Sequence, residues 1–167
     1  MSKKSIKITI LGEPMGKQRP KVSVLGTSKF AHAYTPKETI NYESKVVDAY
    51  KNELQKLGLP ITKQFFEAEK ELIAIIDAYY KIPKSHYKFY KKTGKTDLTP
   101  SGKLMLNGAR KPIKKPDCDN IAKICLDALN GIAYHDDSAI VTLLVRKYYA
   151  EVPRVEIDIS ERESGAE

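Results

Sequence analysis

The sequence contains no tryptophan and only two cysteines, and none of its apolar stretches is long enough to cross a bilayer. Its first residues, MSKKSIKITI, lack the apolar core of a secretory signal, so we expect a cytoplasmic protein that does not bind membranes. Cys118 and Cys125 lie seven residues apart in one expected helix, which disfavours a disulfide between them. A phosphate-binding P-loop is also excluded, because Gly12 and Gly16 are too close for the G-x-x-x-x-G-K-[ST] pattern.

What is present is the composition of one globular domain, 1–167, with 41% hydrophobic and 30% charged residues. The net charge of +8 is concentrated in one segment. Residues 81–115 hold eleven Lys and Arg against one acid, Asp97, whereas the rest of the chain has 18 basic and 20 acidic residues. Such a segment suits a polyanion such as nucleic acid, and its alternative is a solubilising lysine-rich loop. We expect a basic loop at 84–112.

Hydrophobic periodicity predicts a mixed α/β (α+β) fold with one mixed sheet and two main helices. Strands are expected at 5–11, in a hairpin around Gly26, at 71–80, and in two final runs, 140–149 and 152–160, paired antiparallel. The run 71–80 is apolar on both faces, which indicates a central strand. Helices are expected from a capping box at Thr35 to about Leu57, over a short stretch from Thr99 to Met105, and at 119–130. The tail at 161–167 is expected to fray.

Three aromatic residues, Tyr87, Phe89 and Tyr90, are interleaved with lysines in the basic segment. Aromatic rings beside cations can stack on unpaired bases while the cations follow the phosphate backbone. They can equally anchor a long loop to the body of the protein. The residues alone leave both interpretations open.

Two acidic pairs, Asp117/Asp119 and Asp136/Asp137, flank the last expected helix. One acid at the helix N-terminus is explained by capping, but two are explained poorly. A helix of this length spans about 18 Å, so a shared site requires the following loop to fold back. If the pairs converge, oxygen ligands without His or Cys select Mg²⁺ or Mn²⁺.

A metal ion held by carboxylates beside a basic segment indicates phosphodiester hydrolysis. Lys123, one turn after Asp119, can stabilise charge in the transition state or can simply pair with Asp119 or Asp127 on the helix surface. From the residues alone, nuclease chemistry and non-catalytic nucleic-acid binding both remain open.

The stretch KPDCDNIAKICLDALNGIAYHDDSAI resembles the signature of the RusA family of Holliday junction resolvases, K-P-D-x-D-N-x-x-K-x-x-x-D-A-L-x-x…D-D-x-x-I. GEPMGKQRPK and YTPKETINYE also resemble segments of its Gram-positive and prophage-borne members. The resemblance implies a Mg²⁺-dependent endodeoxyribonuclease, with Mn²⁺ as a substitute and no small-molecule cofactor. It also implies a homodimer that makes paired nicks in four-way DNA junctions during recombination and repair.

The motif carries specific residues onto this sequence. It implies a catalytic set of Asp117, Asp119, Asp137 and Lys123, with the three aspartates and Asp136 as metal ligands, and a structural role for Asp127. We expect DNA contacts from ten cations: Lys17, Arg19, Lys88, Lys91, Lys92, Lys95, Arg110, Lys111, Lys114 and Lys115. The insert at 84–112 is absent from the compact enterobacterial members. The alternatives are a broader fork or flap nuclease and a non-catalytic DNA-binding protein on the same scaffold.

Overall fold

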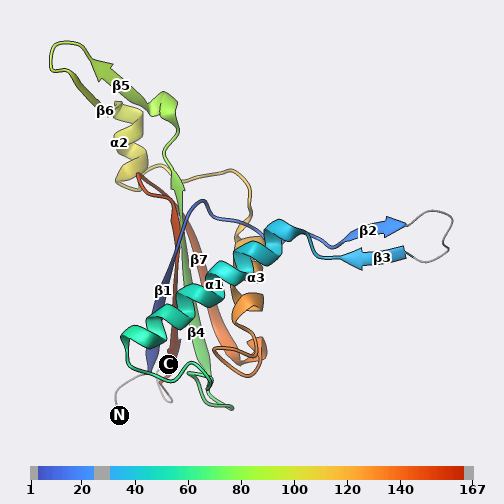
Figure 1. The fold of residues 1–167 in the computed structure, drawn as a ribbon. Coiled ribbons are helices and arrows are strands. Elements are labelled where there is room, and N and C mark those ends of the chain that lie inside the picture. Colours follow the sequence, from blue (N-terminus) through green and yellow to red (C-terminus); the bar gives the residue numbers. More distant parts are fainter. Residues whose placement is uncertain (1–3, 25–30, 164–167) are drawn as a thin grey trace.

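The computed structural model describes residues 4–24 and 31–163, and its centre is a four-stranded mixed sheet with the strand order β1-β8-β4-β7 (Figure 1). The strands are β1 (Ser5–Leu11), β4 (Leu72–Lys81), β7 (Ile140–Ala150) and β8 (Arg154–Glu161). β8 runs antiparallel to both of its neighbours, whereas β7 runs parallel to β4. The predicted mixed sheet is therefore confirmed.

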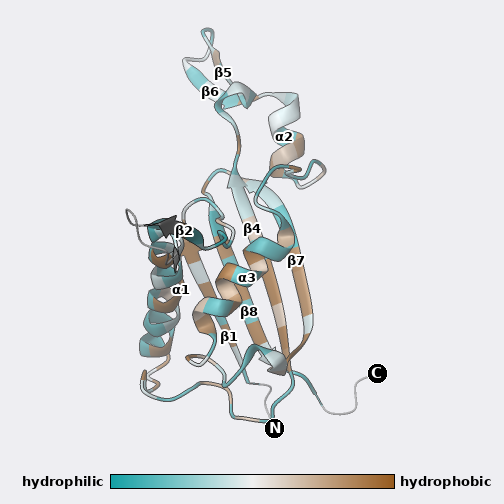
Figure 2. Ribbon diagram, turned by 90° about the vertical axis from the view of Figure 1, so that its right-hand side faces the viewer, coloured by the Kyte–Doolittle hydropathy of each residue, from teal (hydrophilic) through white to brown (hydrophobic). Residues whose placement is uncertain are grey.

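Two helices, α1 (Lys37–Lys56) and α3 (Cys118–Leu129), cover one face of this sheet (Figure 2). Alternate residues of β1, β4 and β8 point into the layer between sheet and helices and are buried. Ile121 and Ile124 of α3 and Val46 of α1 are fully buried in the same core. The apolar faces predicted from helical spacing are thus the faces that pack.

One predicted pairing is wrong. The last two strands, β7 and β8, do not pair with each other, because β4 lies between them. β4 can occupy this position since it is apolar on both faces, and its two backbone edges bond to β7 on one side and β8 on the other. The consequence is that β7 becomes an edge strand of the sheet.

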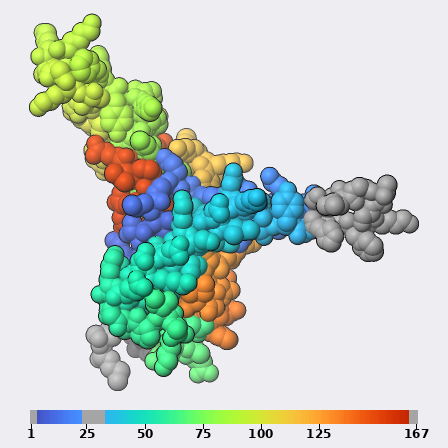
Figure 3. Space-filling model, in the orientation of Figure 1, coloured from blue at the N-terminus to red at the C-terminus, as the bar shows by residue number. Residues whose placement is uncertain are grey.

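Two arms leave the body. The first is the hairpin of β2 (Lys21–Val24) and β3 (Ala31–Tyr34), whose predicted turn at Gly26 lies outside the described residues. The second contains η1 (Lys84–His86), the hairpin of β5 (Tyr87–Tyr90) and β6 (Lys95–Leu98), and α2 (Pro100–Leu106). The expected basic loop at 84–112 is therefore largely a folded arm, whose hairpin projects from the body (Figure 3) while α2 contacts β7.

The ends of two elements differ from the expectation. Thr35 does not cap α1: Pro36 is the N-cap residue in an extended conformation, and Glu38 accepts a 2.9 Å hydrogen bond from Gln18 instead of closing a capping box. The tail was expected to fray from residue 161, but Arg162 bonds to the backbone and to the carboxylate of Glu71. Residues 164–167 lie outside the described residues. Among the helices of the described part, none is long and apolar enough to cross a membrane.

Candidate functional site

The first acidic pair stands at the N-terminus of α3. Asp117 is the N-cap residue, yet its side chain accepts no hydrogen bond from the helix, and Asp119 lies in the first turn. Both side chains are exposed, and among the described residues neither takes part in an ion pair. These carboxylates are therefore not used as capping acceptors, and their oxygens are available to bind a cation.

The backbone that leads into this pair is held from the sheet. The hydroxyl of Tyr80, near the end of β4, donates to the carbonyl oxygen of Pro116 at 3.2 Å. The ammonium group of Lys147 on β7 donates to the same oxygen at 3.1 Å and also to the carbonyl of Lys114. Burial raises the pKa of Tyr80, so this hydroxyl remains a donor. The position of Asp117 is thus fixed by two side chains from neighbouring strands.

The same segment is held from the N-terminal loop. The backbone N–H of Lys17 donates to the carbonyl of Asn120 at 2.9 Å. Gly16 lies so close that a Cβ atom there would be 2.7 Å from the Cβ of Pro116 and 3.0 Å from that of Asn120. Only glycine fits this contact without displacing the start of α3.

The second acidic pair lies at the opposite end of the sheet. Asp136 is the N-cap of η2 (Asp137–Ala139) and accepts a 2.9 Å hydrogen bond from the backbone of Ser138. The side chain of Ser138, and then this backbone bond, lower the pKa of its carboxyl group. η2 leads directly into β7, whose first residue, Ile140, is opposite Leu72 at the start of β4. From Leu72 to Tyr80 the strand rises by about 26 Å. Because Tyr80 bonds to Pro116 and Leu72 is opposite Ile140, the two pairs lie near opposite ends of β4.

The four aspartates therefore do not form one site within a single chain. Among the described residues, no group of three or more carboxylate, imidazole or thiol side chains is close enough to share a metal ion. Asp117 and Asp119 offer suitable oxygen ligands for Mg²⁺, but they form only part of a set.

Burial raises the pKa of the Cys125 thiol to about 12, which agrees with the prediction that this cysteine belongs to the core.

Other predicted residues have different surroundings. Lys123 is exposed one turn after Asp119 and has no ion pair with any described residue, so it points to solvent near the acids. Asp127 pairs with Lys17 at 3.1 Å, and Lys17 also pairs with Glu43 of α1. Lys17 thus links α1 and α3, and we remove it from the expected DNA contacts because its charge is already neutralised.

Eight of the nine remaining expected DNA contacts form two groups at the same end of the sheet as Asp117. Lys88, Lys91, Lys92 and Lys95 are exposed on the β5–β6 hairpin. The second group lies between α2 and α3 and consists of exposed side chains: Arg110, Lys111, Lys114 and Lys115. Lys111 lies 3.5 Å from the ring centroid of Tyr148, and Lys114 lies 4.9 Å from that of Tyr80. Arg19 is exposed on the N-terminal loop.

Sequence reasoning missed Lys147. The alternation of β7 places Val145, Lys147 and Tyr149 on the core-facing side. A lysine between two apolar residues on that side was the signal that could have identified it. A cation that faces the core needs hydrogen-bond acceptors, and the carbonyl groups before α3 supply them.

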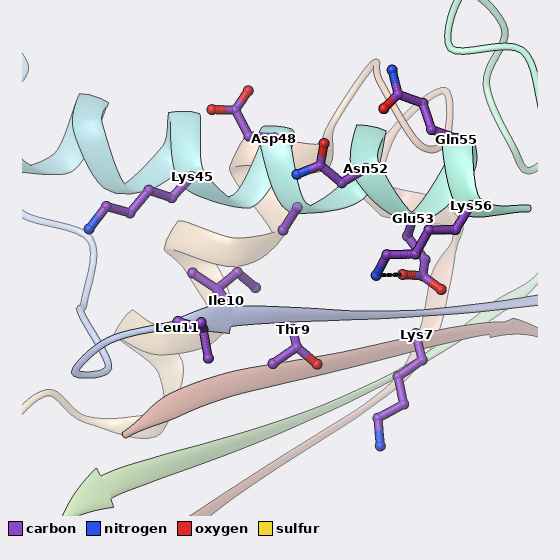
Figure 4. A pocket seen from close by; sticks show the side chains of 11 residues that line it. Lys7, Thr9, Ile10, Leu11, Lys45, Asp48, Asn52, Glu53, Gln55 and Lys56 are labelled. Carbon is purple, nitrogen blue, oxygen red and sulfur yellow. Dashed lines mark hydrogen bonds and ion pairs between the residues drawn. The ribbon is translucent and has the colours of Figure 1, made fainter. Parts of the chain in front are cut away.

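Two surface hollows lie away from the first acidic pair and are lined by other residues. An open groove of ≈ 820 Å³ runs between α1 and the edge strand β1, and residues of both signs, including Lys7, Lys45 and Asp48, line it (Figure 4). A smaller hollow of ≈ 250 Å³ lies beside Asp136 and is lined by Glu67 and Glu69. The β7 start is thus acidic, whereas its end is surrounded by cations.

Comparison with known proteins gives one family and one relative. A family model described as "Endodeoxyribonuclease RusA" matches residues 12–160, which include both acidic pairs and the β5–β6 arm. "Uncharacterized protein YqaN" of Bacillus subtilis (strain 168) is 32% identical over 157 residues, which cover 93% of this chain and 96% of that relative.

Proposed function

Because this chain belongs to the RusA family of endodeoxyribonucleases, we propose that it is a Mg²⁺-dependent nuclease that resolves four-way DNA junctions by paired phosphodiester hydrolysis. The observation that carries this proposal is the exposed pair Asp117 and Asp119: the Asp117 side chain makes no capping hydrogen bond, and neither carboxylate pairs with a described cation. Exposed cations precede this pair along the connection from α2, and others lie on the β5–β6 hairpin at the same end of the sheet. Carboxylates for a metal ion therefore adjoin a surface for phosphates.

Two copies of the chain are needed to complete the site in this proposal. β7 is an edge strand, and its side chains Val141, Leu143 and Leu144 are exposed, which is unusual for a free sheet edge. Antiparallel pairing of two β7 strands around a two-fold axis would bring the start of one strand to the end of the other. The Asp136/Asp137 pair of one chain would then adjoin the N-terminus of α3 in its partner.

The charges at the two ends of β7 favour this arrangement. Glu67, Glu69 and Asp136 lie near the start of the strand, whereas Lys111 and Lys114 lie near its end. An antiparallel pair of β7 strands places each acidic end against these lysines, and complementary charges of this kind favour one orientation over others. The same arrangement brings the two acidic pairs together, so a bound cation would have to neutralise their mutual repulsion.

The residues would act as follows. Asp117 and Asp119, with Asp137 and Asp136 from the partner chain, would hold the metal ion through carboxylate oxygens. A bound Mg²⁺ supplies polarisation of the phosphoryl oxygen and a lower pKa for the attacking water. Lys123, exposed beside Asp119, would stabilise the negative charge that develops on the phosphate. Lys114 and Lys115 would orient the DNA backbone.

A cleavage panel tests the activity. Labelled four-way junction, fork, flap and linear duplex of matched sequence are incubated with Mg²⁺ or with chelator. The proposal requires symmetrical paired nicks on the junction in Mg²⁺ and none with chelator. Equal cleavage of forks or flaps would favour the broader nuclease, and an absence of cleavage on every substrate would favour a DNA-binding protein on the same scaffold.

Asp119→Asn tests the site assignment on the same substrates. The variant removes a metal ligand and keeps the shape of the side chain, so we expect junction binding to persist and cleavage to be lost. Asp48→Asn, which changes an exposed carboxylate of α1 that the proposal gives no role, is the matched control and should cleave normally. Wild-type cleavage by the Asp119 variant would contradict the assignment.

A further inference from the structure

The β5–β6 hairpin has a base that is firmly packed. Tyr87 and Leu98, which are opposite each other in the hairpin, join a small core with Ile82 and Met105. Gly102 of α2 lies against this base, where a Cβ would be 2.8 Å from the carbonyl oxygen of His86. The backbone of Thr99 also donates to that oxygen at 2.9 Å. The hairpin is therefore held in a defined direction.

Beyond this base, the hairpin leaves two aromatic side chains exposed, Phe89 and Tyr90. Phe89 lies on the same hairpin face as Tyr87 because the two are separated by one residue, yet Phe89 is 58% exposed. Its cross-strand partner is Thr96, which is exposed and adds no apolar cover. Tyr90 is 39% exposed on the other face. The structure thus assigns anchoring to Tyr87 and leaves Phe89 without a packing role.

The surroundings of Phe89 are strongly basic. Four lysines share its hairpin: Lys88, Lys91, Lys92 and Lys95. The single acid of the hairpin, Asp97, lies 3.4 Å from Lys103 and is paired with it. Lysine is depleted from the cores of protein–protein interfaces, so this surface does not suit a protein partner. Exposed aromatics among lysines suit single-stranded or unpaired nucleic acid, where rings stack on bases and cations contact phosphates.

We propose that Phe89 stacks on an unstacked base at the branch point of the DNA junction and thereby distinguishes branched DNA from linear duplex. This inference rests on the proposed function and specifies how the arm contributes to it. A continuous duplex exposes no base face inside its stack, so Phe89 gains a partner only where the stack is interrupted. The four lysines contact phosphates of either DNA form and supply affinity without selectivity.

The experiment measures binding to a four-way junction and to a linear duplex of the same sequence, in the Asp119→Asn background so that no cleavage occurs. Phe89→Ala is expected to weaken junction binding about fivefold or more, since one base–aromatic stack is worth about 1 kcal/mol at the low end. Duplex binding should stay unchanged. Leu57→Ala, which truncates an exposed residue on the far end of α1, is the matched control and should alter neither affinity.

Two further variants separate stacking from hairpin stability. Phe89→Leu keeps an apolar side chain but removes the ring, and it should lose selectivity as Phe89→Ala does. Phe89→Trp keeps a ring and should retain selectivity. A junction with 2-aminopurine at the branch point reports stacking directly, because its fluorescence should fall on binding of the Phe89 protein and not of Phe89→Leu.

The outcomes are distinct. Equal loss of junction and duplex affinity, or no loss of either, would overturn the role of Phe89, and so would full selectivity in Phe89→Leu. If the protein with Phe89 intact does not prefer the junction over duplex, the proposed function fails first. The junction-to-duplex ratio of that parent protein therefore separates failure of the inference from failure of the function on which it rests.

Discussion

The ammonium group of Lys147 lies 3.1 Å from the carbonyl oxygen of Pro116, the residue immediately before Asp117. This contact joins the end of the edge strand β7 to the start of α3. It couples the candidate metal ligands to the strand that we propose as the contact between two chains. Its removal should therefore affect metal binding as well as folding.

Lys147→Met removes this donor and leaves the carbonyl groups of Lys114 and Pro116 without it. We expect the free energy of unfolding to fall by about 1.5–3 kcal/mol, the range for hydrogen bonds to charged groups. We also expect several-fold weaker Mn²⁺ binding, measured by electron paramagnetic resonance titration. Lys147→Arg keeps a cationic donor and should restore most of the metal affinity. Equal Mn²⁺ affinity in Lys147→Met and wild type would show that the contact is only structural.

Gly16→Ala introduces a methyl group where a Cβ would be 2.7 Å from the Cβ of Pro116. Overpacking of this kind costs about 1–3 kcal/mol, and here it displaces the segment that carries Asp117. We expect lower stability in urea unfolding together with weaker Mn²⁺ binding.

Gly58→Ala is the control for this variant. Gly58 has φ +67° after α1 with no atom near its would-be Cβ, so the variant should lose about 1–2 kcal/mol of stability through backbone strain and keep its metal affinity. If both glycine variants bind Mn²⁺ equally well, the close contact at Gly16 does not position the acids.

Lys17 and Arg19 should separate stability from DNA binding. Burial alone lowers the pKa of Lys17, but hydrogen bonds to Glu43 and Asp127 raise it above its ordinary value, so the lysine stays charged between the two acids. Lys17→Met should cost about 1–2 kcal/mol because it leaves two partly buried carboxylates facing each other. Arg19→Ala should leave stability unchanged and weaken junction binding. Urea unfolding measures the stability of both variants, and a binding titration measures their affinity for the junction. Weaker junction binding by Lys17→Met at unchanged stability would show that Lys17 contacts DNA.

A mixing experiment tests whether the site is shared between two chains. Asp119→Asn and Asp137→Asn are each expected to be inactive. Mixed dimers would hold one site with both substitutions and one intact site, so reassorted protein should nick one strand of the junction. Random exchange makes about half of the dimers mixed. If each site lay within one chain, every site in a mixed dimer would carry one substitution, and the mixture would stay inactive.

The lysines at the tip of the arm should contribute through salt-dependent phosphate contacts. Replacing Lys91, Lys92 and Lys95 with alanine should weaken binding to junction and duplex alike and reduce the slope of log K against log salt by about 2–3. Binding measured between low and moderate salt gives this slope. Lys45→Ala, on α1, is the control for general loss of charge. An unchanged slope in the triple variant would show that these lysines do not contact phosphates and would favour the alternative, a solubilising lysine-rich surface.

Much of the fold could be predicted because the signals were local. The apolar face of α3 follows from helical spacing, and the burial of Ile121 and Ile124 confirms it. The central position of β4 follows from apolar residues on both of its faces. The capping box at Thr35 failed because Gln18, distant in sequence, bonds Glu38. In the arm at 84–112, the short helix expected from Thr99 to Met105 is α2, whereas the β5–β6 hairpin was missed because the small core at its base joins Ile82 to Met105 across the segment.

The sequence by itself determined the chemistry that is available: two acidic pairs at fixed positions, a lysine-rich segment between residues 81 and 115, and a motif of the RusA type. Those features depend only on residue types and their spacing. Tertiary structure decided where they act. Because β7 pairs in parallel with β4, Asp137 before β7 lies near the start of β4, whereas Tyr80 and Lys147 hold the segment before Asp117 near its end. Packing across the sheet, which no local pattern encodes, thus separates the acids within one chain and leaves the edge of β7 free for a second.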